Sequence, residues 1–101
     1  MLTHAIDSRP ELAALRSSID NLDASLIFIL SERFRLTRKV GELKAHHKLP
    51  AADGAREDFQ IARLRRLAEE AQLDPVFAER FLRFIIEEVI QHHRAAAGAD
   101  A

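Results

Sequence analysis

The feature of this sequence that most constrains its fold is one long apolar stripe. Apolar residues recur at alternating steps of three and four, the spacing that places side chains on one face of an α-helix. These positions are Leu12, Leu15, Ile19, Leu22, Leu26, Ile29, Leu36, Val40 and Leu43. Position 33 belongs to the same series, yet it is occupied by Arg33. The stripe therefore predicts a long helix that carries a guanidinium on its apolar face.

The chain around the stripe predicts an all-α fold with three helices. The first helix is expected to begin near Ser8, which has capping-box spacing to Glu11, and to end between positions 43 and 48. Asp53 is a candidate N-cap for a second helix over about 54–72, and Asp74 with Pro75 begins a third that runs to about position 94. We accordingly expect an N-terminal arm over 1–8, a helical domain over 9–94 and a disordered tail over 95–101.

The length of the first helix predicts a partner. A helix of about 38 residues is about 57 Å long, whereas a compact domain of about 100 residues is roughly 35 Å across. The stripe cannot be covered by its own chain alone, and a symmetric, intertwined homodimer is the expected solution. A coiled-coil dimer without any chemistry would show the same three-four spacing and stays an alternative.

Composition excludes several classes of function. The 15 basic and 16 acidic residues give a net charge of -1, which offers no electrostatic basis for binding nucleic acid or an anionic membrane. Cysteine is absent, and the adjacent histidine pairs 46–47 and 92–93 lack the spacing of a helical metal site, so no metal is expected. The sequence contains neither a signal-peptide pattern nor a membrane-length apolar run, and we expect a cytoplasmic protein.

Arg33 requires a partner because burying an unpaired guanidinium is costly. A structural ion pair or a side chain that reaches the edge of the core would satisfy it, and so would an anionic ligand. Lys44 favours the ligand, because it lies about three turns after Arg33 on the same helix face. Arg16 is about 25 Å before Arg33 and could join them only from an antiparallel partner. Gly41 would allow close approach of a ligand or of a neighbouring helix.

The segment "LAALRSSIDNLDASLIFILSERFRLTRKVGELK", followed by "DGARE" and "FIIEEV", resembles the all-helical chorismate mutase family over about residues 11–94. The resemblance implies a domain of three helices, an intertwined dimer and two active sites that each draw on both chains. It implies rearrangement of the chorismate dianion to prephenate, in phenylalanine and tyrosine biosynthesis, without metal or cofactor. Arg16 of one chain and Arg33 of the other would then hold the substrate carboxylates, and Lys44 would contact a carboxylate and the ether oxygen.

The resemblance extends to the second helix and departs in the third. Asp53 and Glu57 would address the ring hydroxyl, and Arg56 would support the region of the ring carboxylate. The family has a small hydroxyl residue where this chain has Val89, so one hydrogen bond to the ring carboxylate is expected to be missing. Where the family has glutamine or glutamate facing the ether oxygen, this chain has His93, and our hypothesis is that His93 donates an N–H there. The alternative is that "QHHR" is a solvated C-terminal turn.

Two other functions stay open at this point. Isochorismate-pyruvate lyase, a related helical activity that forms salicylate, uses the same arginines and lysine. The block at 53–57 favours the mutase, whereas "LPA" at 49–51 and Val89 are compatible with the lyase. A helical dimerisation module without substrate is the alternative from a different class, and the cost of placing Arg33 on the apolar face argues against it.

Overall fold

The structure is a computed structural model that describes residues 9–100, and the side chains of residues 9–98. The described residues form three α-helices, α1 (Pro10–His46), α2 (Gly54–Glu70) and α3 (Pro75–Asp100), and they contain no strand. The expected all-α class and the three-helix order are therefore confirmed. Ser8 and the expected arm over 1–8 lie outside the described residues.

The two helix ends that face the connections share one backbone motif. Lys48 follows α1 with a φ of 56°, and Gln72 follows α2 with a φ of 61°. At these left-handed positions the chain folds back, so that the amide of Leu49 donates to the carbonyl of Lys44 over 2.8 Å. The amide of Leu73 donates to the carbonyl of Ala68 over the same distance. These bonds satisfy carbonyls that would otherwise be left over at the helix ends.

Both later helices begin at the aspartates that the sequence indicates. The Asp53 carboxylate accepts a hydrogen bond from the amide of Arg56 over 3.1 Å, which confirms it as the N-cap of α2. Asp74 accepts from the amide of Val76 over 2.9 Å, and Pro75 occupies the first position of α3, where the missing amide hydrogen costs nothing.

The expected end of the third helix was wrong. α3 continues past position 94 to Asp100, so residues 95–100 are helical and not the disordered tail that was expected. The physical reason is the run Ala95–Ala97: alanine has the highest helix propensity, and no proline follows to stop the helix. Residue 101 lies outside the described part.

The chain divides into two compact units, Met1–Arg35 and Leu36–Ala101. In the first unit, the described residues belong to α1 apart from Arg9, and the apolar stripe is exposed. Leu15 is 64% exposed, Leu22 68% and Ile29 64%. None of the described residues of this unit is buried. The first unit therefore presents an amphipathic helix whose apolar face its own residues do not cover.

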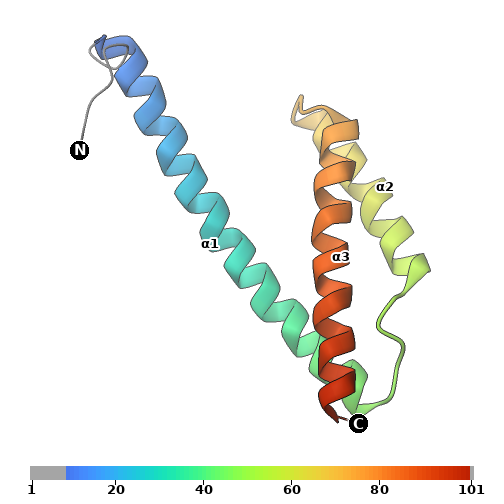
Figure 1. The fold of residues 1–101 in the computed structure, drawn as a ribbon. Helices are drawn as coiled ribbons and strands as arrows, with labels where there is room; N and C mark the ends of the chain where they lie inside the picture. Colours follow the sequence, from blue (N-terminus) through green and yellow to red (C-terminus); the bar gives the residue numbers. More distant parts are fainter. Residues whose placement is uncertain (1–8, 101) are drawn as a thin grey trace. The chain divides into compact units, whose positions relative to one another are not determined.

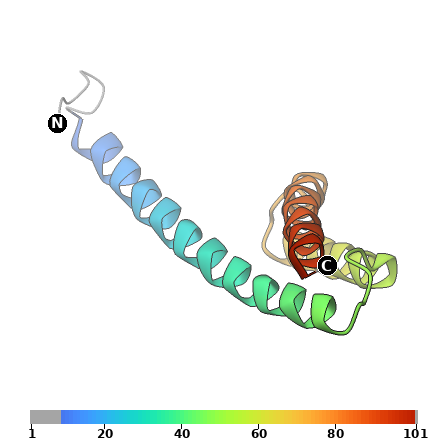
Figure 2. The ribbon, with the colours of Figure 1, turned by 60° about the horizontal axis from the view of Figure 1, so that its bottom comes forward.

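The second unit contains the core. α2 and α3 lie side by side, as both views show (Figures 1 and 2). The buried apolar side chains come mostly from α3 and are joined by one alanine of α2; they are Ala68, Ala78, Leu82, Ile85 and Ile86. The end of α3 lies beside the last turns of α1 (Figure 1), where Gly41 and His93 are both buried.

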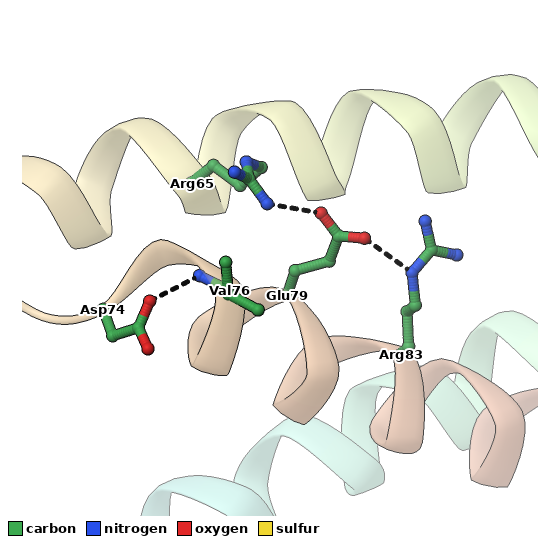
Figure 3. Close-up of polar contacts among 5 residues, drawn as sticks. All are labelled: Arg65, Asp74, Val76, Glu79 and Arg83. Atoms are coloured by element: carbon green, nitrogen blue, oxygen red, sulfur yellow. Dashed lines mark hydrogen bonds and ion pairs between the residues drawn. The ribbon is translucent and has the colours of Figure 1, made fainter.

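One carboxylate joins α2 to α3 at the polar edge of this pair. Glu79 of α3 accepts a hydrogen bond from Arg65 of α2 over 2.8 Å and from Arg83 of α3 over 2.9 Å (Figure 3). The hydrogen bonds from Arg83 and then from Arg65 lower the pKa of the Glu79 carboxyl. A carboxyl whose pKa is lower in the folded chain than in the unfolded chain stabilises the fold above its ordinary range, and this contribution is lost as the pH falls through the lowered value.

We predict that Glu79→Gln lowers the free energy of unfolding at pH 7, and that its difference from the parent protein shrinks when the pH is lowered to about 3. The effect is small because the three side chains are partly solvated. Urea denaturation at the two pH values measures it. Glu69→Gln, which removes one negative charge from the neighbouring helix, is the control. A Glu79→Gln difference that is the same at both pH values would contradict this account.

Candidate active site

The two arginines of the predicted site lie on α1 in the first unit. Arg16 and Arg33 are half-buried, whereas Leu15 and Ile29, stripe residues close to each of them, are both 64% exposed. The helix separates the two arginines by about 25 Å along its axis. They therefore cannot contact the same small ligand from one chain. A site that uses both requires two copies of the helix.

Lys44, in the second unit, is held by the connection that follows its own helix. Its Nζ donates to the carbonyl oxygen of Ala51 over 3.2 Å, and the side chain is half-buried. The left-handed residue Lys48 turns the chain back toward α1 and makes this contact possible. The ammonium group is thereby tied to the segment that leads directly into Asp53 and α2.

The residues at the start of α2 carry mainly local contacts. The Asp53 carboxylate caps the helix through the amide of Arg56, and the Arg56 guanidinium lies over the Phe59 ring at 5.5 Å. Glu57 is half-buried in the first turn, where a carboxylate interacts favourably with the helix dipole. Asp53 therefore has a structural task beside the substrate contact expected from the sequence.

His93 is the buried polar side chain of this unit. It is 4% exposed, so the alternative of a solvated C-terminal turn is wrong for this residue. Its Nε2 lies 2.9 Å from the carbonyl oxygen of Thr37 on α1. Val89, one turn earlier on α3, is half-buried. The Nε2 atom of His93 is thus already hydrogen-bonded to the main chain, so a contact with a ligand would have to use Nδ1.

Gly41 explains how the ring reaches that carbonyl. A Cβ at position 41 would lie 2.5 Å from Cδ2 of His93, closer than side-chain carbons approach. The absence of a side chain lets α3 pack against α1 closely enough for the hydrogen bond to Thr37. Of the two explanations that the sequence left open for Gly41, the structure supports close approach of a neighbouring helix.

Two partners of the site residues escaped prediction. Thr37 and Ala51 act through main-chain carbonyl oxygens, which every residue has, so their types give no signal in the sequence. The apolar pattern identifies Lys44 and the family resemblance identifies His93, but neither identifies the group that holds each side chain. The glycine at position 41 was the one available hint that something packs against this part of α1.

One depression among the described residues lies apart from the predicted site. A shallow depression of about 510 Å³ follows α3 and is lined by Glu87, Glu88, Ile90, Gln91 and Arg94, none of which belongs to the predicted set. Within residues 9–100, no group of three potential metal ligands comes together. No helix in this range has the length and apolarity needed to cross a membrane.

Comparison with known proteins places the chain in one family. Residues 15–94 match the family model described as chorismate mutase type II. The chain is 37% identical over 78 residues to the T-protein of Enterobacter agglomerans, which is 77% of this chain and 21% of that protein. It is 34% identical over 88 residues to the bifunctional chorismate mutase/prephenate dehydratase of Escherichia coli K12, covering 87% of this chain and 23% of that protein.

A shorter relative matches over most of its own length. The chain is 30% identical over 77 residues to the chorismate mutase of Methanocaldococcus jannaschii, which is 76% of this chain and 78% of that protein. By contrast, the chain spans only about a fifth of the T-protein and of the bifunctional relatives. The similarity to the longer proteins is therefore confined to one part of them.

Two glycines within helices offer a matched test of the α1–α3 contact. We predict that Gly41→Ala lowers the free energy of unfolding by about 1–3 kcal/mol, because the added methyl group collides with the His93 ring. Gly98→Ala should instead raise it by up to about 1 kcal/mol, because nothing lies within 4 Å of the added group and alanine favours the helix. Urea denaturation of both variants measures this. Equal stabilisation by the two substitutions would show that the contact is absent.

Proposed function

The chain belongs to the chorismate mutase type II family, and we propose that it rearranges chorismate to prephenate, for phenylalanine and tyrosine biosynthesis, as a homodimer with shared active sites. The observation that carries the proposal is Arg33, a half-buried guanidinium within an otherwise apolar helix face. In a chain of this family, that cation would bind a carboxylate of the dianionic substrate. The cytoplasmic location expected from the sequence stays a prediction.

The uncovered apolar face of α1 supports the proposed dimer. Leu15, Leu22 and Ile29 are each more than 60% exposed, and the stripe continues through the first unit. Monomeric proteins rarely leave so continuous an apolar surface in water. A second copy of the chain would cover it, because the stripe of one helix complements the same stripe of another in a two-fold arrangement.

The same dimer would complete the anion site. With antiparallel first helices, Arg16 of one chain approaches the end of the other chain that carries Arg33 and Lys44. Guanidinium groups bind planar carboxylates through two parallel hydrogen bonds, so the two arginines suit the two carboxylates of chorismate. Lys44, held over the α1–α2 connection by Ala51, would contact a carboxylate and the ether oxygen.

The remaining residues would define the ring end of the site. Asp53 and Glu57 would receive the ring hydroxyl, and Arg56 would support the region of the ring carboxylate. Val89 offers no hydrogen bond there, so the arginines carry more of the carboxylate recognition. His93 would serve the ether oxygen together with Lys44.

The chemistry matches these residue types. The rearrangement forms one carbon–carbon bond and breaks one carbon–oxygen bond within a single molecule, and no proton is gained or lost. It requires the enolpyruvyl arm to be folded over the ring and the developing negative charge on the ether oxygen to be stabilised. Positioning by the arginines supplies the first requirement and a preorganised cation supplies the second. A rate enhancement of about 10⁶ corresponds to about 8 kcal/mol from both together.

Isochorismate-pyruvate lyase is the second candidate, and Val89 is the observation that favours it. An apolar, half-buried side chain at this position removes one hydrogen bond that the mutase uses for the ring carboxylate. The lyase would employ the same arginines and lysine on an isomeric dianion. A non-catalytic dimerisation module would make no use of them.

We predict that the purified chain converts chorismate to prephenate without added metal or cofactor, and that Arg33→Ala lowers kcat/KM by about 10²–10³-fold. The loss follows from removing a charged hydrogen-bond donor to a substrate carboxylate. Arg38→Ala, which removes the same charge from a different and exposed face of α1, is the control and should retain activity. Chorismate consumption with product identification measures both, with isochorismate assayed in parallel.

The products separate the candidates. Prephenate formation that depends on Arg33 supports the mutase. Salicylate and pyruvate from isochorismate as the dominant products would replace it with the lyase. A chain that converts neither compound would be a dimerisation module, and the mutase proposal would be wrong.

A further inference from the structure

The hydrogen bond between His93 and Thr37 determines which ring nitrogen carries hydrogen. A main-chain carbonyl oxygen can only accept, so Nε2 of His93, at 2.9 Å from the Thr37 oxygen, must be the donor. In the neutral imidazole only one nitrogen bears hydrogen. Nδ1 of the neutral ring therefore presents a lone pair and cannot donate to a ligand oxygen.

Nδ1 is itself an unusual atom in this fold. It is buried, and no group among the described residues forms a hydrogen bond to it. The whole residue is 4% exposed, so solvent contact is minimal. Buried polar atoms are normally satisfied, and one that is not satisfied by the chain is a candidate contact for a ligand.

The ring cannot easily turn to exchange its nitrogens. Gly41 offers no side chain, and the ring fills the space that a Cβ would occupy, with Cδ2 at 2.5 Å from that position and Nε2 at 3.1 Å. Rotating the ring would also break the bond to Thr37. The position and the tautomer of His93 are thus fixed by α1.

The helix turns that hold the ring carry several charged side chains. On α1, Lys44 lies one turn beyond Gly41 and brings a positive charge to the same side of the helix. On α3, the positions one turn to either side of His93 are uncharged, namely Val89, Ile90, Ala96 and Ala97. Glu42, on the same turn of α1, and Arg94, next to His93 on α3, are both exposed.

Building on the proposed chorismate site, we infer that His93 acts there as an imidazolium whose second proton is taken up together with the dianion. Solvent supplies the proton to Nδ1, and the resulting N–H donates to an oxygen of the ligand. The proton stays on His93 throughout, because the rearrangement neither consumes nor releases one. The substrate carboxylates bring negative charge to the ring when the ligand binds.

This inference makes activity depend on pH in a defined direction. Histidine is the side chain that changes its charge near neutral pH. If only the imidazolium donates, kcat/KM falls roughly tenfold for each pH unit on the alkaline side. His93→Gln replaces the ring by an amide that donates without a second proton, so its kcat/KM should be nearly constant over the same range. His92→Gln, at the exposed neighbouring position, should keep the profile of the parent protein.

Proton uptake provides a readout that does not depend on turnover. A dianionic transition-state mimic is titrated into the protein by calorimetry near pH 8, in two buffers with different ionisation enthalpies. The parent protein and His92→Gln should take up close to one proton per bound mimic, and His93→Gln should take up none. If His93→Gln does not fold, the proton uptake of the parent protein and its pH profile decide the question.

The outcomes separate this inference from the proposed function. An active parent protein with a flat pH profile, or a mimic that binds without proton uptake, would overturn the role of His93 and leave the mutase intact. The same holds if His93→Gln takes up as much proton as the parent protein. A chain that neither converts chorismate nor binds the mimic at any pH would overturn the proposed function and this inference with it.

Discussion

The structure depends on one apolar helix face that its own residues do not cover. α1 extends over 37 residues, and none of its described residues before Arg35 is buried. A helix of this length stays helical in a protein chiefly because its apolar face packs against something. The core of the second unit is small and belongs mainly to α3. In the proposed dimer, the free energy that keeps the first half of α1 folded comes from another copy of the chain, which links the fold to the proposed shared site.

Much of the fold could be predicted from local sequence rules. The three-four stripe, the caps at Asp53 and Asp74 and the proline at position 75 are signals that act within one or two turns, and the helices follow them. The end of α3 could not be predicted as well, because a run of alanines contains no helix stop signal and its composition resembles that of a disordered tail. The long-range contacts were also missed where they use main-chain carbonyls, as at Thr37 and Ala51.

In the site, too, the charged side chains could be predicted from the sequence, whereas the groups that hold them could not. Arg33 and Lys44 were found because a charge on an apolar face breaks a pattern. His93 was found through a family resemblance, yet its burial and its bond to Thr37 come only from the packing of α3 on α1. Gly41 combines the two kinds of information. Its small size is visible in the sequence, and the structure shows that the small size makes room for the His93 ring. The carbonyl of Ala51 in the α1–α2 connection thus determines where the lysine is held, and the carbonyl of Thr37 on α1 determines which nitrogen of the histidine is available.

The central claim is that each active site combines Arg16 of one chain with Arg33 and Lys44 of the other. The most direct measurement is to refold inactive Arg16→Ala and Arg33→Ala chains together and to assay chorismate conversion. Half of the dimers would be mixed and would each hold one intact site, so activity should recover to about a quarter of the parent level. Arg33→Ala refolded with Lys44→Ala should recover none, because no dimer of these chains contains an intact site. Recovery in neither mixture, or equal recovery in both, would contradict a site shared between two chains.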